Sequence, residues 1–198
     1  TGIFRGFENV GDGYGMIMAL LGGDDAGGGV QWAPQVIAEA SAHGLILGEN
    51  GVLYDTKKGE KLPHNVSPMP PMSEEELAKR GEPTTADVIP KHVARYWDLM
   101  ALADRQPVKV IGHDAKLRDR PGFEADFITR GSILEEQYIC KVPEVLMPVK
   151  GDWRMRWEGG ETILAPGDTC LVPEGIARSV APSMTVESSM YLSLIHIS

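Results

Sequence analysis

The chain has 198 residues, of which 42% are hydrophobic, and it carries a formal net charge of −9. This composition is ordinary for a folded protein in water, and the length allows one sizeable core with accessory segments. No window approaches the ~18 consecutive apolar residues that cross a bilayer, and the acidic excess without a Lys/Arg cluster repels phosphate backbones. We therefore expect a cytoplasmic protein that binds neither membrane nor nucleic acid.

The N-terminal part contains two predicted elements separated by a Gly/Asp-rich loop. The chain opens without a methionine, inside a strand-like run, which predicts that sequence is missing upstream. Residues 14–21 (YGMIMALL) form an apolar run after an Asp-Gly turn signal, which predicts a buried strand. From Trp32 the apolar residues recur at helical spacing, with Pro34 near the start of the predicted helix and Gly44 beyond its end.

The middle of the chain reads as a linker with short helices. Residues 50–82 are rich in Pro, Lys, Glu and Gly. Within them, Ser73 followed by Glu76 is the capping-box signature of a short helix that Gly81 would end. A stronger helix is expected from about Pro90 to Ala103. Its apolar face carries Val93, Tyr96, Trp97 and Met100.

From residue 122 onward the pattern changes to short β-rich runs separated by Gly, Pro and Asp turns, which predicts an antiparallel sandwich or barrel. The runs are FEADFITR, QYICKV, EVLMPVKG, WRMRW, ETILA, DTCLVP and TVESSMYLSL. The last residues, SLIHIS, fit no continuing element, so we predict a non-native tail at residues 193–198 and no role for His196.

Two patterns in the β-rich part resemble in their spacing the two signature motifs of the cupin superfamily. The first family motif runs Gly, His-x-His, Glu, Gly, and the residues at its positions are Gly131, Gln137, Ile139, Glu144 and Gly151. The second runs Gly, Pro-x-Gly, His, Asn, and its positions hold Gly167, Pro173, Gly175, Arg178 and Pro182. The resemblance implies an all-β fold, the double-stranded β-helix or cupin jelly-roll barrel, with a partly helical N-terminal linker region.

The end of the second motif recurs near the N-terminus, where Gly2, Arg5 and Asn9 occupy its last three positions. The repeat predicts a bicupin with four parts. They are residues 1–22, the closing strands of a truncated upstream cupin; 23–118, the linker; 119–192, the C-terminal cupin barrel; and 193–198, the non-native tail. The resemblance is to the quercetinase, gentisate and hydroxynaphthoate dioxygenase types.

Cupin dioxygenases hold a divalent metal with imidazoles and one carboxylate, and this chain lacks the imidazoles at those positions. Gln137, Ile139 and Arg178 cannot replace them. Ile139 has no donor atom, and Arg178 carries a fixed positive charge that repels a dication. With the alternative spacing, Tyr138 and Cys140 take the first two positions, and a thiolate there is a metal donor in principle. Arg178 still disfavours a metal, so we expect no metal cofactor in this chain.

Three hypotheses for function follow. In the first, the chain is the non-metal half of a bicupin whose parent is an aromatic-ring dioxygenase, with iron or another divalent metal held in the missing upstream cupin. Arg5 weakens this hypothesis, because it stands at the equivalent ligand position there. In the second, a metal-free cupin binds a small anionic or hydroxylated molecule. In the third, the barrel is structural and dimerises; the full-length protein is expected to be a homo-oligomer.

The degenerate site carries one geometric prediction. In the cupin fold the Glu of the first motif and the last ligand of the second point into the same cavity, and here they are Glu144 and Arg178. A carboxylate in an apolar barrel needs a cation, so we predict an ion pair between them, with a further hydrogen bond from Gln137.

Overall fold

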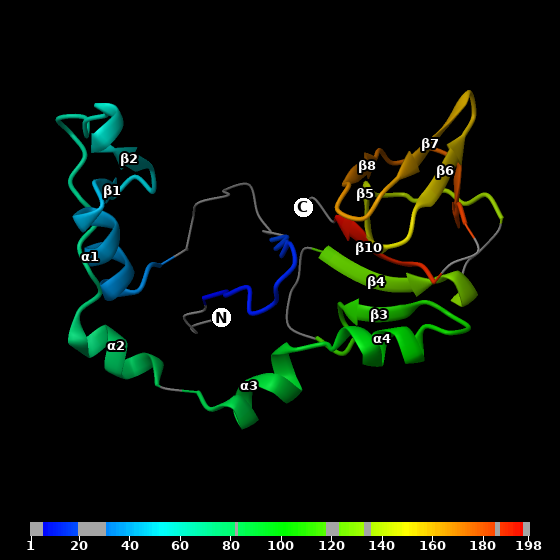
Figure 1. Ribbon diagram of the computed structural model, residues 1–198, viewed down its shortest axis with the longest axis horizontal. Helices are drawn as coiled ribbons and strands as arrows, with labels where there is room; N and C mark the ends of the chain where they lie inside the picture. Colours follow the sequence, from blue (N-terminus) through cyan, green and yellow to red (C-terminus); the bar gives the residue numbers. More distant parts are fainter. Residues whose placement is uncertain are drawn as a thin grey trace. The chain divides into compact units, whose positions relative to one another are not determined.

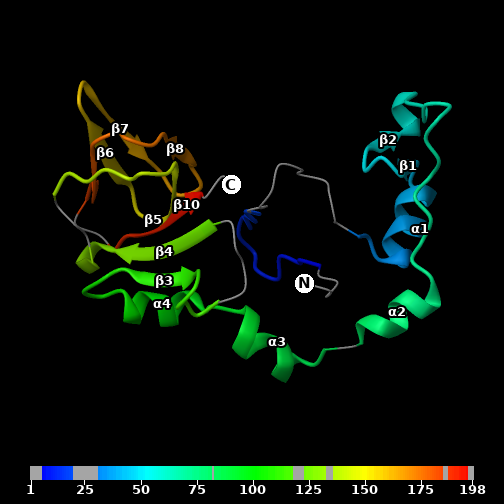
Figure 2. The ribbon, with the colours of Figure 1, turned by 180° about the vertical axis from the view of Figure 1, so that it is seen from behind.

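The computed structural model describes residues 6–19, 31–81, 83–117, 123–132, 136–184 and 187–195 (Figures 1 and 2). The chain divides into two compact units, Thr1–Thr84 and Thr85–Ser198. Among the described residues, no helix combines the length and the apolar character needed to cross a bilayer. Gly2 and Arg5, on which the internal repeat rests, lie outside the described residues.

The first unit contains short elements, and two helix predictions for it are confirmed. Its elements are α1 (Pro34–Ala42), β1 (Leu45–Leu47), β2 (Leu53–Asp55), the 3₁₀ helix η1 (Thr56–Lys58) and α2 (Glu74–Arg80). Pro34 is the first residue of α1. A backbone N–H at this position would have no partner within the helix, so proline, which lacks this N–H, is well tolerated there. Ser73 and Glu76 form the reciprocal capping box that starts α2. β1 and β2 pair as an antiparallel ribbon.

The strand predicted at residues 14–21 is wrong for its described part. Residues 14–19 form no strand, and their side chains are exposed: Tyr14 is 97% and Ile17 is 62% exposed. Residues 20 and 21 lie outside the described residues. An apolar run forms a strand only where a neighbouring strand accepts its backbone hydrogen bonds, and among the described residues none pairs with this one.

The helix predicted over residues 90–103 is split in two. α3 (Thr85–His92) contains Pro90 near its end, and α4 (Tyr96–Leu102) starts after an extended Arg95. Proline lacks the N–H that a helix interior uses, so a helix continues only briefly past it. The predicted apolar face is also wrong in part, because Leu99 is the buried residue of α4 while Trp97 is 68% exposed.

The second unit is mostly sheet, as predicted, and all its strand pairs are antiparallel. One sheet has the order β3-β4-β10-β5-β8 and the other the order β7-β6-β9. The bounds are β3 (Val108–Ile111), β4 (Phe123–Thr129), β5 (Glu144–Lys150), β6 (Trp153–Trp157), β7 (Gly160–Leu164), β8 (Cys170–Val172), β9 (Arg178–Pro182) and β10 (Ser189–Ile195), with the 3₁₀ helix η2 (Arg130–Ser132) after β4.

Three strand predictions need correction. β9 lies in a stretch for which no strand was predicted. The run QYICKV forms no strand and pairs only through an isolated bridge at Tyr138. Residues 193–195 continue β10 and pair with β4, so the prediction that the tail fits no element is wrong for them. Residues 196–198 lie outside the described residues.

Two apolar clusters hold the second unit together. The first lies between the two sheets and joins Ile128, Leu146, Val172 and Met190 of one sheet to Trp153, Met155, Leu164 and Val180 of the other. The second lies under α4, where Leu99 and Ala103 pack on Val110 and Phe127. Helix α4 and strand β3 therefore belong to this unit, although the sequence places them in the linker of residues 23–118.

Several glycines of the cupin-like motifs have a backbone reason to be glycine, and Gly131 and Gly175 are two examples. A Cβ on Gly131 would lie 1.9 Å from the carbonyl oxygen of Asp104, so only glycine lets the end of β4 approach the end of α4 this closely. Gly175 has φ +76°, the left-handed conformation that other residues adopt at a cost. The motif spacing thus follows the turns of the second unit.

Candidate functional site

Glu144 and Arg178 form an ion pair between the two sheets, as predicted. Glu144 is the first residue of β5 and is 2% exposed, and Arg178 is the first residue of β9 and is 0% exposed. Arg178 donates to Glu144 Oε2 from Nε at 3.1 Å and from Nη2 at 2.5 Å. Both donors converge on one carboxylate oxygen, so the pair is not the fork in which each oxygen takes one donor.

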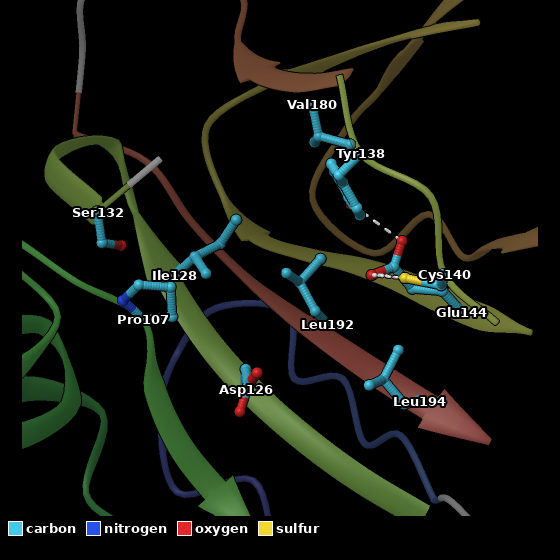
Figure 3. Close-up of a pocket in the computed structure, with 10 residues that line it drawn as sticks. All are labelled: Pro107, Asp126, Ile128, Ser132, Tyr138, Cys140, Glu144, Val180, Leu192 and Leu194. Carbon is cyan, nitrogen blue, oxygen red and sulfur yellow. Dashed lines mark hydrogen bonds between the residues drawn. The ribbon is translucent and has the colours of Figure 1, made fainter. Parts of the chain in front are cut away.

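Tyr138 and Cys140 complete the surroundings of this carboxylate. The Tyr138 hydroxyl donates to Glu144 Oε2 at 3.0 Å, and the Cys140 thiol lies 3.8 Å from Oε1 (Figure 3). The Arg178 guanidinium also lies 4.4 Å from the centre of the Tyr138 ring. Two backbone hydrogen bonds, Tyr138 N to Arg178 O at 2.9 Å and Arg178 N to Tyr138 O at 3.0 Å, hold the segment on the start of β9. This bridge positions the phenol above the ion pair.

The structure brings Tyr138 and Cys140 to the site rather than Gln137 and Ile139. Ile139 is 61% exposed and Gln137 is also exposed, so the hydrogen bond expected from Gln137 is supplied by Tyr138. Extended backbone alternates its side chains, so a shift of one residue exchanges the inward and outward sets. The alternative motif spacing, with Tyr138 and Cys140 at the first two positions, is therefore the one that the fold adopts.

The charges of the site change the pKa values of its members. Burial alone would lower the pKa of Arg178, but its hydrogen bonds to Glu144 and the charge of that carboxylate outweigh burial and raise it. Burial, reinforced by the charge of Glu144, raises the pKa of Tyr138 and that of the Cys140 thiol. All three side chains therefore keep their protons at neutral pH, with Arg178 as the cation.

The motif resemblance to cupins implies a bound divalent metal, and the residues of this site do not fit one. A thiol that keeps its proton is a poor metal ligand, since the thiolate is the form that binds. The carboxylate of Glu144 is already neutralised by Arg178, whose charge would repel a dication. In the described part of the chain, no three His, Cys, Asp or Glu side chains gather as a metal site would need.

A cavity of about 210 Å³ opens beside the ion pair. It is lined by Pro107, Asp126, Ile128, Ser132, Tyr138, Cys140, Glu144, Val180, Leu192 and Leu194 (Figure 3). Asp126 was not predicted as a site residue. The signal in the sequence was an acidic residue in the middle of a β-rich run, between Ala125 and Phe127. Both of these neighbours are buried, and Phe127 packs in the cluster under α4.

No family model matches the chain, and no curated protein matches it. Among solved structures, a protein from Neisseria meningitidis is similar over 54% of this chain and 100% of its own, with 18% identity and a TM-score of 0.42. A cupin-2 domain containing protein from Shewanella frigidimarina is similar over 52% of this chain and 95% of its own, with 12% identity and a TM-score of 0.40. The Cnp3 cupin domain from Schizosaccharomyces pombe is similar over 41% of this chain and 57% of its own, with 12% identity and a TM-score of 0.36. Likeness at this level assigns neither a fold nor an activity.

Proposed function

We propose that the second unit is a cupin-type barrel domain that binds a small molecule and in which an internal ion pair stands where relatives hold a catalytic metal. Two antiparallel sheets enclosing one apolar core, and motif glycines with backbone reasons to be glycine, support the cupin assignment. The observation that carries the functional proposal is the pair itself. Arg178, at the last ligand position of the second motif, donates two hydrogen bonds to Glu144, the carboxylate of the first.

The residues that line the cavity beside the ion pair distinguish between an anionic and a hydroxylated ligand, the two classes expected from the sequence. Among the described residues that line it, none is a Lys, Arg or His, and the nearby Arg178 is already paired with Glu144. A carboxylate or phosphate entering this cavity would lose its water without gaining a cation, which is costly. The geometry therefore favours a hydroxylated or cationic ligand over an anionic one.

The bicupin parentage is kept as part of this proposal on the strength of the motif resemblance. In a bicupin parent, this unit would be the half without a metal, and iron or another divalent ion would belong to the other cupin. Homo-oligomerisation of the full-length protein belongs to the same proposal. Metal content and oligomeric mass of the full-length protein test both.

The metal-free site is tested by metal analysis of the purified chain. After incubation with Fe²⁺, Mn²⁺, Ni²⁺ or Zn²⁺ and dialysis, plasma emission should find far less than one ion per chain. A Tyr138→His/Cys140→His/Arg178→His variant serves as the matched control, because it supplies three imidazoles around Glu144 and should retain an ion. Near-equimolar metal in the unmodified chain that is lost in Glu144→Ala would contradict the proposal.

A further inference from the structure

Asp126 stands in the cavity with part of its carboxyl group unpaired. It lies in the middle of β4, opposite Leu192 of β10 and opposite Lys109 of β3. Its side chain reaches the cavity that Leu192 also lines (Figure 3). The Oδ1 atom is buried and has no hydrogen-bond partner among the described residues. A buried carboxyl oxygen without a partner is costly, and such groups are rare in native proteins, so each one calls for an explanation such as a catalytic role or an ion that satisfies it.

The charged neighbours of Asp126 are occupied with other partners. Lys109 Nζ donates to Glu124 Oε2 at 3.1 Å, and Glu144 is paired with Arg178. Burial raises the pKa of Asp126; the charge of Lys109 opposes the rise, while Glu124 and Glu144 add to it. Among the described residues, the ionised form of Asp126 is therefore compensated only in part, by the charge of Lys109, and a cation entering the cavity would supply a direct partner.

The cavity offers this cation an apolar place for the rest of the molecule. Its apolar walls come from Pro107, Ile128, Val180, Leu192 and Leu194. A dry apolar cavity of about 150 Å³ accepts benzene, so about 210 Å³ accommodates one ring with a short arm. An ion without an apolar body would leave these walls in contact with water.

Asp126 and Glu144 are too far apart to act together on one ammonium group. Strand β10 lies between β4 and β5, and both pair with it. Neighbouring strands are about 4.8 Å apart, so the backbones of β4 and β5 are separated by roughly 10 Å. Figure 3 shows Leu192 drawn between the two carboxyl groups. Asp126 alone would therefore anchor the charge.

We propose that this cavity binds a small organic ammonium ion, with its charged group on Asp126 and a body of about one ring against Ile128, Val180 and Leu192. The inference rests on the proposed small-molecule binding and names the ligand class of that cavity. A charge-assisted hydrogen bond to the unpaired oxygen gives the affinity, and the apolar walls limit the size.

Calorimetric titration of the full chain with three probes of one shape tests the ligand class. The probes are benzylamine, benzyl alcohol and benzoate. Benzylamine should bind about ten- to a hundredfold more tightly than benzyl alcohol, the range expected for a hydrogen bond between charged groups, and benzoate should not bind. Asp126→Asn should weaken benzylamine by the same factor and leave benzyl alcohol unchanged. Glu174→Gln, which removes one exposed negative charge from the same unit, should have no effect.

A pH series on the unmodified chain keeps the test independent of whether the variant folds. Benzylamine affinity should fall as the pH is lowered through the raised pKa of Asp126, because the amine stays protonated while the carboxylate does not. Equal binding of benzylamine and benzyl alcohol, or benzylamine binding unchanged in folded Asp126→Asn, overturns the ammonium site and leaves the small-molecule proposal standing. Failure of all three probes to bind overturns both.

Discussion

Arg178 is held in the interior of the second unit by contacts on three sides. Its Nε and Nη2 donate to Glu144, its Nη1 donates to the Ile176 carbonyl oxygen at 3.0 Å, and its guanidinium lies over the Tyr138 ring. The desolvation of a buried charge costs several kcal/mol, and it is repaid only when the geometry is good and the remaining donors are satisfied. Most of the stabilisation from Arg178 therefore depends on its partners staying in place.

Breaking the pair on one side should cost much more stability than removing it altogether. Glu144→Leu or Arg178→Met should each lower the free energy of unfolding by about 3 to 5 kcal/mol, because the remaining charge stays buried without its partner. The double variant Glu144→Leu/Arg178→Met should lose much less. Urea unfolding of the variants in a double-mutant cycle gives the coupling energy.

The exposed pair between Arg156 and Glu161, with Nε and Oε2 at 2.9 Å, is the matched control. Its coupling energy should be far smaller than that of the buried pair, since solvent screens the two charges. Coupling of Glu144 with Arg178 no larger than this would show that the buried pair is not the stabilising contact that its geometry indicates.

Asp126 should give the second unit a pH dependence of its own. Because burial raises the pKa of Asp126 above 3.8, the ordinary value for an aspartate, the folded chain holds this proton more tightly than the unfolded chain. The stability that comes from this proton is present below pH 3.8 and is lost as the pH rises through the folded pKa. Asp126→Asn should therefore be more stable than the unmodified chain at pH 7, by on the order of 1 kcal/mol because part of the side chain stays exposed.

Urea unfolding of both chains across a pH series measures this difference directly. The gain from Asp126→Asn should shrink toward zero as the pH approaches 3.8, where Asp126 loses its charge in both states. A variant that is less stable than the unmodified chain at neutral pH would mean that the ionised carboxylate has a favourable partner in the folded protein.

Strand β4 serves two clusters at once and is fixed at its end. Its inward face carries Asp126 and Ile128 toward the cavity, and its outward face carries Phe127 under α4. At its end, the Thr129 hydroxyl donates to the Ala103 carbonyl oxygen at 2.6 Å. Gly131 then passes close to the backbone of Asp104. The position of the cavity wall is thus tied to the end of α4.

Replacing Gly131 with alanine should separate these two elements. The added Cβ would lie 1.9 Å from the Asp104 carbonyl oxygen, a backbone atom that cannot turn aside. We expect a loss of about 1 to 3 kcal/mol in the free energy of unfolding, the usual cost of overpacking, measured by urea unfolding. Gly13→Ala should be close to neutral, because no atom lies within 4 Å of the added carbon. Equal effects of the two substitutions would contradict the close approach.

The elements that were predicted well are those whose signal is local. The capping box at Ser73 and the proline at Pro34 mark helix starts through neighbouring backbone groups alone. The strands β4, β5, β6 and β7 coincide with predicted β-rich runs, and β6 begins with the alternation of buried and less buried side chains expected of a half-buried strand. Strand β9 was missed because it begins with Arg178, whose burial depends on Glu144 in the other sheet. The strand predicted over residues 14–19 was wrong because an apolar composition does not by itself supply a neighbouring strand to pair with.

The candidate site was predictable as far as motif spacing reaches. Glu144 and Arg178 were paired correctly because both motifs place them in the same interior. Tyr138 and Cys140 were left as an alternative, because the family motif allows either three or four residues before its Glu. A shift of one residue exchanges the side chains that point inward with those that point outward, and the sequence does not say which set faces Glu144. Asp126 belongs to no motif, and its unpaired oxygen becomes visible only when β3, β10 and the opposite sheet surround it.

At the scale of the whole molecule, the second unit should fold without the first. The contacts divide the chain after Thr84, and α4 and β3 contribute Leu99 and Val110 to the second apolar cluster. A chain of residues 85–198 should therefore melt cooperatively. A second chain, of residues 119–198, would start where the sequence analysis places the start of the barrel. Its free energy of unfolding should be lower by roughly 3 to 6 kcal/mol, because it lacks the buried side chains of Leu99 and Val110.

Scanning calorimetry of the two truncated chains compares them directly. A loss of that size is a large part of the free energy of unfolding of a typical domain, which is roughly 5 to 15 kcal/mol. The shorter chain should therefore be unfolded or aggregated under conditions in which the longer one melts reversibly. Similar melting of both chains would show that α4 and β3 are dispensable to the barrel.

The cation that faces Glu144 is covalently part of the chain, and this changes what the fold depends on. A domain that closes around a free ion gains stability by mass action, so its unfolding temperature follows the concentration of that ion and falls when a chelator removes it. Arg178 has a fixed stoichiometry and no dissociation equilibrium with the surrounding solution. Its pairing with Glu144 is therefore equally available in a cell starved of iron or manganese and in one that is replete, and each newly made chain carries its own counter-ion.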